Sequence, residues 1–277
     1  MPQPRISPLI SAAELDDLIG SVTLLDVRYV MGGPSGVAEY VEGHIPTAIY
    51  VDLDTALAAT PGARGRHPLP EAETFGAAMR RVGVRADKPV VVYDDWQGRA
   101  AARCWWLLRH FGHDDVRVLD GGLTAWRAAG GAIDDGMRLP VTGTFEPGPG
   151  VLPTIGPDEV LAFAADQVLV DARNPERFRG ELEPVDPVAG HIPGAVNVPT
   201  GTNVRVDGTF RSPDEIRALY AVAGVGDDTE VGVYCGSGVT AAHDLLALAS
   251  AGIDGVLYPG SWSEWVADQS RPVATGG

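Results

Sequence analysis

One cysteine of this sequence stands where a thiol could act as a nucleophile. Cys235 follows the apolar run Val231–Tyr234 and precedes a Gly-Ser-Gly loop that leads into a helical pattern. A thiol between a strand end and a helix N-terminus faces the positive end of the helix dipole and unpaired backbone N–H groups, which favour the thiolate. Because glycines let successive N–H groups converge, the loop is expected to form an anion nest. We therefore predict that Cys235 holds a thiolate or persulfide anion, in a nest built from Gly236, Gly238, Val239 and Thr240.

The pattern around Cys235 occurs twice along the chain. The recurring pairs are 24–28 with 169–173, 43–46 with 190–193, 90–94 with 231–235, and Gly121 and Trp126 with Gly260 and Trp265. Repeats in the same order and at similar spacing indicate two copies of one structural unit. Asp94 stands in the first copy where Cys235 stands in the second, and a carboxylate cannot form a persulfide. We predict that the first copy is catalytically silent and, since its loop lacks the paired glycines, that it forms no anion nest.

Each copy alternates short apolar runs with helical patterns. In the first copy we expect strands at 22–27, 90–93 and 116–119, helices at 100–111 and 123–129, and a long loop from the first strand to Gly43. Ser11 and Glu14 have the spacing of a capping box that opens a further helix. Strands apolar on both faces that alternate with helices predict an α/β fold, a mainly parallel sheet with helices on both faces in each of two domains.

A Pro- and Gly-rich stretch divides the two copies. Residues 144–153 read Thr-Phe-Glu-Pro-Gly-Pro-Gly-Val-Leu-Pro, which neither a helix nor a central strand accommodates. We predict an N-terminal domain over 1–143, a linker over 144–153 and a C-terminal domain over 154–277 that carries Cys235.

Charge and cysteine content narrow the class of function. The 277 residues carry a net charge of −16, whereas binding to nucleic acid or to an anionic membrane requires clustered Lys and Arg. Two cysteines make neither a disulfide framework nor a four-thiolate zinc site. Met1–Arg5 lead into no signal-peptide core, and no apolar run approaches the ~18 residues that cross a bilayer. We expect a cytoplasmic protein with no nucleic-acid or membrane partner.

The segment Tyr234–Thr240, the paired Gly-His-Ile-Pro motifs and the closing segment Ser261–Trp265 together resemble a tandem-domain rhodanese, over essentially the whole chain. The Cys-Gly-Ser-Gly-Val-Thr loop is similar to that of 3-mercaptopyruvate sulfurtransferases, whereas thiosulfate-specific enzymes tend to carry a basic Cys-Arg-Lys-Gly loop. The resemblance implies a sulfurtransferase that moves sulfur from 3-mercaptopyruvate or thiosulfate to a thiol, a thioredoxin-like protein or cyanide. The sulfur would travel as a persulfide on Cys235, without a metal or an organic cofactor.

The resemblance also implies which residues bind the sulfur donor. Arg177 matches the family's arginine for the donor's anionic end, with a solvated loop arginine as the alternative, and Arg179 is a weaker candidate. A second arginine is expected ahead of the second Gly-His-Ile-Pro motif, but residues 183–187 contain no basic residue. The neutral loop favours 3-mercaptopyruvate as the donor, and the missing arginine leaves thiosulfate open.

A proton relay is implied as well. In the mercaptopyruvate branch the loop hydroxyl, here Ser237, is thought to act with a His and an Asp, and His44 matches the histidine position. The only acidic residues between 29 and 43 are Glu39 and Glu42, so the expected Asp does not appear. The alternative, favoured by the recurrence of His44 as His191, is that both histidines fix the turn after the first strand of each copy.

Several rival interpretations remain to be weighed. A cysteine phosphatase or arsenate reductase needs an arginine six residues after its cysteine. Position 241 is Ala, so the sequence does not fit either class of enzyme. A non-catalytic rhodanese-like binding module typically lacks the cysteine that is present here. Cys104, in an aromatic helical segment, is expected to be a packed core thiol, and His110 with His113 lacks the further ligands of a metal site. The basic segment 64–67 has two interpretations, a surface loop or a lining of the cleft between domains.

Overall fold

A computed structural model describes residues 7–277, which form two compact units. Unit 1 comprises the chain up to Leu57 with Pro70–Val151 and Val206–Phe210, and unit 2 comprises Ala58–Leu69, Leu152–Arg205 and Arg211–Gly277. Each half of the sequence therefore contributes one short segment to the unit that is built mainly from the other half. The repeat alone did not indicate this exchange. The signal-peptide prediction rests on Met1–Arg5, which lie outside the described residues.

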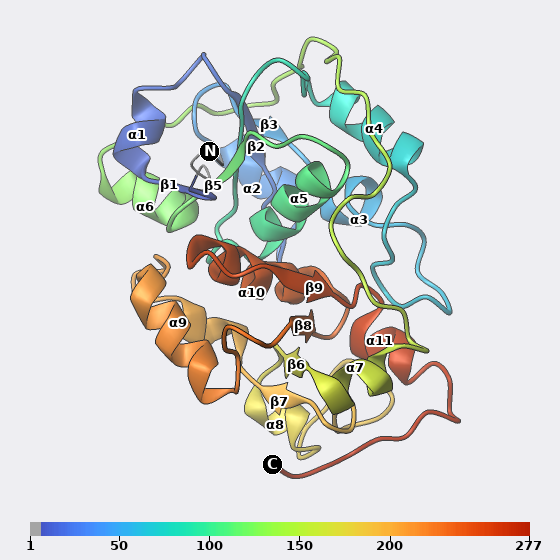
Figure 1. The fold of residues 1–277 in the computed structure, drawn as a ribbon. Helices are drawn as coiled ribbons and strands as arrows, with labels where there is room; N and C mark the ends of the chain where they lie inside the picture. The colour runs from blue at the N-terminus through green and yellow to red at the C-terminus, as the bar shows by residue number, and fades with distance from the viewer. Residues whose placement is uncertain (1–6) are drawn as a thin grey trace. The chain divides into compact units, whose positions relative to one another are not determined.

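Unit 1 contains a parallel five-stranded sheet in the order β1-β5-β4-β2-β3 (Figure 1). Its strands are β1 (Leu9–Ile10), β2 (Thr23–Asp26), β3 (Ile49–Tyr50), β4 (Val90–Tyr93) and β5 (Val116–Leu119). Its helices are α1 (Ala12–Asp16), α2 (Gly36–Glu42), α3 (Leu53–Ala56), α4 (Ala72–Arg81), α5 (Arg99–His110) and α6 (Gly122–Ala128). The capping box of Ser11 and Glu14 is confirmed. The long loop expected before Gly43 is interrupted by α2, because Tyr40 is fully buried and ties this turn of helix to the core.

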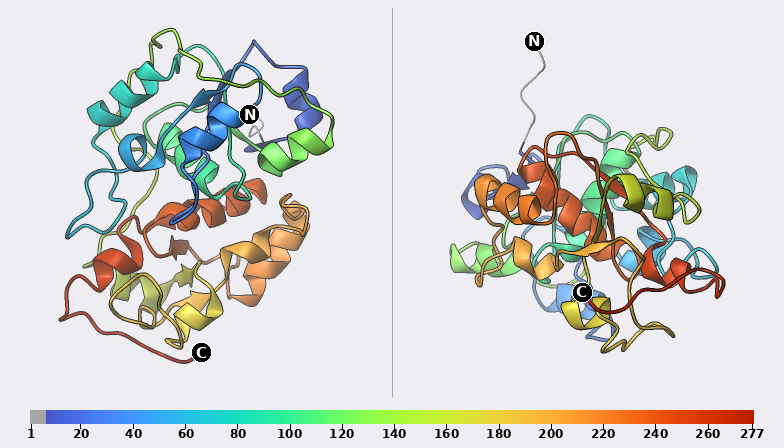
Figure 2. Two further views of the ribbon diagram at one scale, coloured as in Figure 1. Left: turned by 180° about the vertical axis from the view of Figure 1, so that it is seen from behind. Right: turned by 60° about the horizontal axis from the view of Figure 1, so that its bottom comes forward.

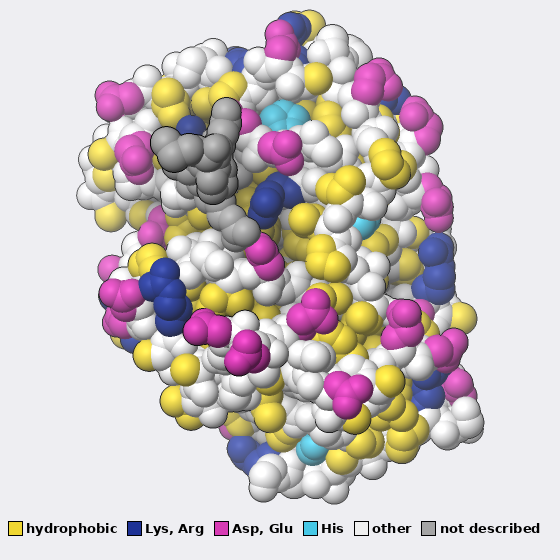
Figure 3. Space-filling model, viewed as in Figure 1, with side chains coloured by type: hydrophobic (Ala, Val, Ile, Leu, Met, Phe, Trp, Pro, Cys, Tyr) yellow, Lys and Arg dark blue, Asp and Glu magenta, His cyan; other side chains and the backbone are white. Residues whose placement is uncertain are grey.

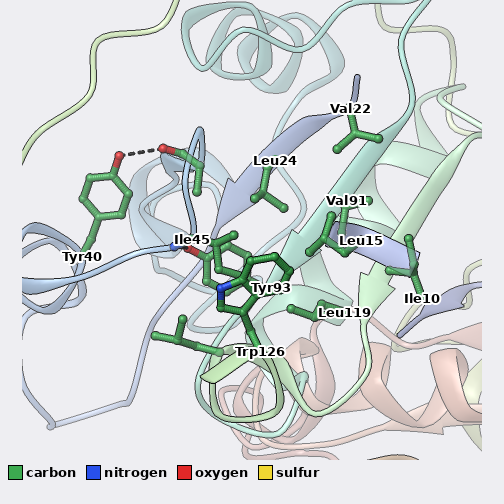
Figure 4. Packing of buried hydrophobic residues seen from close by; sticks show 12 residues of the cluster. Ile10, Leu15, Val22, Leu24, Tyr40, Ile45, Val91, Tyr93, Leu119 and Trp126 are labelled. Carbon is green, nitrogen blue, oxygen red and sulfur yellow. Dashed lines mark hydrogen bonds between the residues drawn. The ribbon is translucent and has the colours of Figure 1, made fainter. Parts of the chain in front are cut away.

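Alternating side chains of the central strand β4 build the two faces of this sheet. Val91 and Tyr93 point into a core shared with Leu15 of α1 and Trp126 of α6 (Figure 4). Helix α5 packs against β4 and β5 outside this cluster. Because successive strand side chains point to opposite faces, a strand that is apolar throughout needs cover on both sides. The predicted fold class, with helices on both faces, is confirmed.

Unit 2 repeats this arrangement with a parallel sheet in the order β7-β6-β8-β9. Its strands are β6 (Val168–Asp171), β7 (Val196–Asn197), β8 (Val231–Tyr234) and β9 (Gly255–Leu257). Its helices are α7 (Val160–Asp166), α8 (Pro175–Phe178), α9 (Pro213–Val222), α10 (Val239–Ser250) and α11 (Ser261–Trp265), with a 3₁₀ turn, η1, at Thr200–Asn203. Helices α9 and α10 lie side by side, and α10 packs on β8 and β9 (Figure 2).

The repeated Asp-x-Arg motif joins the end of one strand to the Gly-His-Ile-Pro turn in each unit. In unit 2 the guanidinium of Arg173 binds both carboxylate oxygens of Asp171 and donates to the carbonyl of Gly190 at 2.6 Å. In unit 1, Arg28 binds Asp26 and donates to the carbonyl of Gly43 at 2.9 Å. Both pairs are buried, so the recurrence of this motif has a structural cause.

Acidic side chains are spread over the viewed face of the molecule, in keeping with the net charge of −16 (Figure 3). No helix among the described residues is long and apolar enough to cross a membrane. Within residues 7–277 no group of three or more His, Cys, Asp or Glu side chains could hold a metal ion.

Candidate active site

The thiol of Cys235 lies at the carboxyl end of β8, directly before α10. The backbone N–H of Gly238 points at the Sγ of Cys235 at 3.1 Å. Gly238 is the N-cap of α10 and has a φ of 79°, a left-handed conformation that glycine adopts without strain. The cysteine is 2% exposed, so the sulfur meets backbone dipoles in place of bulk water. This placement puts the thiol at the positive end of a helix of 12 residues.

Helix α11 holds the residues at the start of this loop through three hydrogen bonds. The hydroxyl of Ser261 accepts a hydrogen bond from the N–H of Cys235 at 3.1 Å. The backbone N–H groups of Trp262 and Ser263 donate to the carbonyls of Cys235 and Gly236, each at 2.9 Å. Because these contacts take up polar groups on both sides of the cysteine, the loop has little freedom to reorient its sulfur.

The corresponding loop of unit 1 forms an anion nest, so the expectation that it would not is wrong. The carboxylate of Asp94 accepts backbone N–H groups from Trp96, Gly98 and Ala100 at 2.8 Å and from Ala101 at 3.0 Å. One glycine, Gly98 with φ 84°, suffices as the N-cap of α5. Burial raises the pKa of Asp94, and the four hydrogen bonds counter this effect. Unit 1 thus fills its nest with the carboxyl group of its own Asp94.

A cluster of two arginines and two acids lies next to the cysteine loop. Arg177 binds Glu183 through Nε at 3.0 Å and Nη2 at 2.7 Å, and its Nη2 also donates to Asp186 at 3.0 Å. The other oxygen of Asp186 binds Nη1 of Arg66. A Cβ placed on Gly236 would lie 2.8 Å from Nη2 of Arg66 and 3.6 Å from Nη1 and Nη2 of Arg177. Two guanidinium groups therefore flank the residue that follows Cys235.

The pKa values of the two acids in this cluster are shifted in opposite directions. Burial raises the pKa of Asp186, and its pairing with Arg66 only partly offsets that effect. Burial also acts on Glu183, but hydrogen bonds from Arg177 and from backbone N–H groups outweigh it and lower the pKa of Glu183. Arg179, the weaker sequence candidate, forms a bidentate pair with Glu181 at 2.8 Å instead. Of the two predicted arginines, only Arg177 is found beside the loop.

The hydroxyl of Ser237 contacts a histidine that the sequence analysis did not assign to the site. Nδ1 of His67 lies 2.7 Å from Oγ of Ser237, and both side chains are buried. Residues 62–66 are anchored by two contacts. Gly62 and Gly65 exchange backbone hydrogen bonds at 3.0 Å, and the N–H of Arg66 donates to the hydroxyl of Ser263 at 3.1 Å. A plain surface loop does not describe this segment, and its concentration of basic residues in an acidic chain was the signal that could have identified it.

His44, the histidine predicted for the relay, occupies the core of unit 1. Its ring stacks on Tyr40 with centroids 4.0 Å apart, and its Nδ1 lies 2.9 Å from the carbonyl of Tyr40. In unit 2, His191 stacks on Phe178 at 3.8 Å and its Nδ1 lies 2.8 Å from the carbonyl of that residue. The same arrangement in both units supports the alternative interpretation, in which the histidine fixes the turn.

Buried side-chain contacts join α10 to the 3₁₀ turn η1. Nδ2 of Asn203 donates to Oδ1 of Asp244 at 2.8 Å, and the hydroxyl of Thr200 contacts Nδ1 of His243 at 2.7 Å. Burial raises the pKa of Asp244 from 3.8 to about 8, against the hydrogen bonds that it accepts. The carboxyl group of Asp244 is therefore protonated at neutral pH.

Comparisons with known proteins identify the family. The rhodanese-like domain model matches residues 11–129 and 157–268. The chain is 48% identical over 99% of both chains to a Mycobacterium tuberculosis protein named "Putative thiosulfate sulfurtransferase SseB". It is 44% identical, over 91% of this chain and 92% of the other, to the "Probable 3-mercaptopyruvate sulfurtransferase" of Pseudomonas aeruginosa. The crystal structure of SseA from Escherichia coli superposes with a TM-score of 0.83 at 36% identity, over 93% of this chain and all 100% of the other. The chain belongs to the rhodanese-like domain family, as a sulfurtransferase with two such domains.

Proposed function

We propose that Cys235 is the sulfur-carrying nucleophile and that unit 2 carries out the transfer alone. The observation that carries the proposal is the thiol at the N-terminus of α10, 3.1 Å from the N–H of Gly238. A thiolate there attacks the donor's sulfur and becomes a persulfide, and an acceptor then removes the outer sulfur. The sulfur is carried covalently, so the reaction needs neither a metal nor an organic cofactor.

The nest of unit 1 supports the way in which a persulfide would be held. Asp94 binds the N–H groups of Ala100 and Ala101, the second and third residues of α5. Thr240 and Ala241 occupy these positions in α10. The carboxylate oxygens of Asp94 are two bonds beyond Cβ, as the outer sulfur of a cysteine persulfide is. We infer that this sulfur accepts hydrogen bonds from Gly238, Thr240 and Ala241, and that unit 1, whose nest is already filled, is silent.

We propose 3-mercaptopyruvate as the preferred donor, with thiosulfate as the second candidate. When a thiolate takes sulfur from 3-mercaptopyruvate, the electron pair of the broken S–C bond stays on carbon and the leaving group is the enolate of pyruvate. That enolate needs a hydrogen-bond donor and a proton, and the Ser237–His67 pair offers both beside Cys235. Thiosulfate releases sulfite, which requires no proton. The paired hydroxyl and imidazole therefore favour 3-mercaptopyruvate, the donor whose sulfur is bonded to carbon.

The acceptor completes the cycle. A thiol, a thioredoxin-like protein or cyanide attacks the outer sulfur, and the electron pair of the broken S–S bond returns to Cys235 as the thiolate. We assign this work to the C-terminal domain at 154–277, joined by 144–153 to the domain at 1–143, with residues 58–69 completing the site. Both cysteines are free, which suits a reducing cytoplasm.

Intact-mass spectrometry of the full chain after treatment with 3-mercaptopyruvate or thiosulfate tests the proposal. We expect one added sulfur on the wild-type protein, removed by a thiol, and none on Cys235→Ser. An adduct that persists in Cys235→Ser would move the nucleophile elsewhere. The absence of any adduct with either donor would favour a binding module without catalytic function.

A further inference from the structure

The cluster beside Gly236 contains an arginine, Arg66, with one buried side-chain donor that the described residues do not use. Arg66 gives Nη1 to Asp186, while its Nε is buried and has no hydrogen-bond partner among the described residues. A buried guanidinium N–H without a partner loses its hydration and gains nothing in return. This Nε–H is therefore an unused hydrogen-bond donor on a guanidinium whose Nη2 lies beside Gly236.

The position of Arg66 matters more than its charge alone. Its Nη2 lies 2.8 Å from the point where a Cβ of residue 236 would stand, so this guanidinium fills the space of a side chain at that position. The loop itself carries no basic residue, and neither does the segment 183–187. Arg66 therefore brings to the loop a positive charge that neither segment contains.

Asp186 binds both arginines and so fixes their guanidinium groups relative to each other. One of its oxygens binds Nη1 of Arg66 and the other accepts from Nη2 of Arg177 at 3.0 Å. The side chain of Asp186 is 3% exposed, whereas those of Arg66 and Arg177 are 27% and 16% exposed. The acid is thus the buried anchor, and each arginine keeps an accessible part.

We propose that Arg66 is the second donor-binding cation, so that the anionic end of the sulfur donor bridges Arg66 and Arg177 above Gly236. A carboxylate has two oxygens and can accept from two guanidinium groups at once, as can the sulfonate end of thiosulfate. The inference rests on the proposed function, because it needs a donor that delivers sulfur to Cys235. It assigns this role to Arg66, the neighbour of His67, which lies 170 residues before Ser237 in the chain. The segment before the second Gly-His-Ile-Pro motif carries no such cation.

The test separates the two half-reactions in the full chain. Arg66→Met, Arg66→Lys and, as the matched control, the exposed Arg64→Met are compared for the rate of persulfide formation from each donor. Persulfide discharge is then measured with dithiothreitol, a neutral acceptor, on protein loaded at high donor concentration. Because a hydrogen bond to a charged group is involved, Arg66→Met should form the persulfide about 10- to 100-fold more slowly at low donor concentration, as Arg177→Ala should. Discharge should not change, Arg66→Lys should recover part of the loss, and Arg64→Met should behave as wild type.

A second variant tests the role of Arg66 without replacing the arginine itself. Gly236→Ala would place a Cβ against Nη2 of Arg66, the far end of a flexible side chain, and should slow persulfide formation at an unchanged melting temperature. Persulfide formation by Arg66→Met at the wild-type rate would overturn the inference, and so would equal losses in formation and discharge. Either result leaves the proposed function intact, whereas a wild-type protein that gains no sulfur contradicts the proposed function itself.

Discussion

Oγ of Ser237 lies 2.7 Å from Nδ1 of His67, although 170 residues separate them in the chain. The segment that carries His67 comes from the first half of the sequence and belongs to unit 2. The loop that follows Cys235 is thus completed by residues that its own half of the sequence does not contain.

The Ser237–His67 pair should matter for one donor and not for the other. We expect Ser237→Ala and His67→Gln to lower kcat with 3-mercaptopyruvate by about 100-fold, the usual scale for loss of positioned proton transfer. With thiosulfate, kcat should change little because sulfite leaves without a proton. Steady-state kinetics with both donors and a saturating acceptor provide the measurement.

His44 serves as the control for that experiment. Its ring is buried against Tyr40, so His44→Asn should lower the melting temperature of the protein while preserving kcat of the fraction that remains folded. Equal losses with both donors in the Ser237 and His67 variants would show that the pair acts on the loop and not on the leaving group.

The two cysteines should separate activity from stability. Cys104 is fully buried in α5 and burial raises the pKa of its thiol, so it stays neutral. We expect Cys104→Ser to retain sulfur transfer and to lose about 1–3 kcal/mol of unfolding free energy, because the new hydroxyl is buried without a planned partner. Cys235→Ser should do the reverse, and chemical denaturation alongside an activity assay measures both. A Cys104→Ser protein that is folded and inactive would contradict this assignment.

Introducing a thiol into unit 1 should not create a second active site. Because the nest around Asp94 is present, we attribute this expectation to the residue that stands where unit 2 has Arg177. Phe178 and Tyr40 stack on equivalent histidines, and the residue before each is Arg177 in unit 2 and Glu39 in unit 1. We expect the Asp94→Cys, Cys235→Ser double variant to gain no sulfur from either donor by intact-mass measurement. A persulfide on its introduced thiol would show that the nest alone suffices.

The carboxyl group of Asp244 should make stability depend on pH. In the folded protein its pKa is about 8, raised from 3.8 by burial, so between these values the folded state retains a proton that the unfolded state releases. The free energy of unfolding then falls as pH rises from about 4 to about 8, by at most about 1.4 kcal/mol per pH unit, and levels off above that range. Asp244→Asn has no such proton and should gain stability relative to wild type as pH rises. Parallel denaturation midpoints for the two proteins between pH 5 and pH 8 would contradict the assignment.

The sequence by itself predicted the repeated fold and pointed to Cys235 as the proposed nucleophile. The Asp-x-Arg and Gly-His-Ile-Pro motifs, the apolar strands and the loop after Cys235 are all contiguous patterns, and their conformations follow from neighbouring residues. A strand followed by a Gly-Ser-Gly loop and a helix can present a thiol to backbone N–H groups in few ways. For that reason Cys235 and the helix behind it were predictable without tertiary information.

Tertiary structure alone decided which side chains surround that thiol. His67 and Arg66 reach the site because residues 58–69 pack on unit 2, and no local pattern encodes the unit on which a connecting segment packs. The histidine that matched by motif, His44, is held instead by stacking on Tyr40. The nest around Asp94 was missed because it is built from the first turn of α5, where helix geometry supplies unpaired N–H groups without a second glycine.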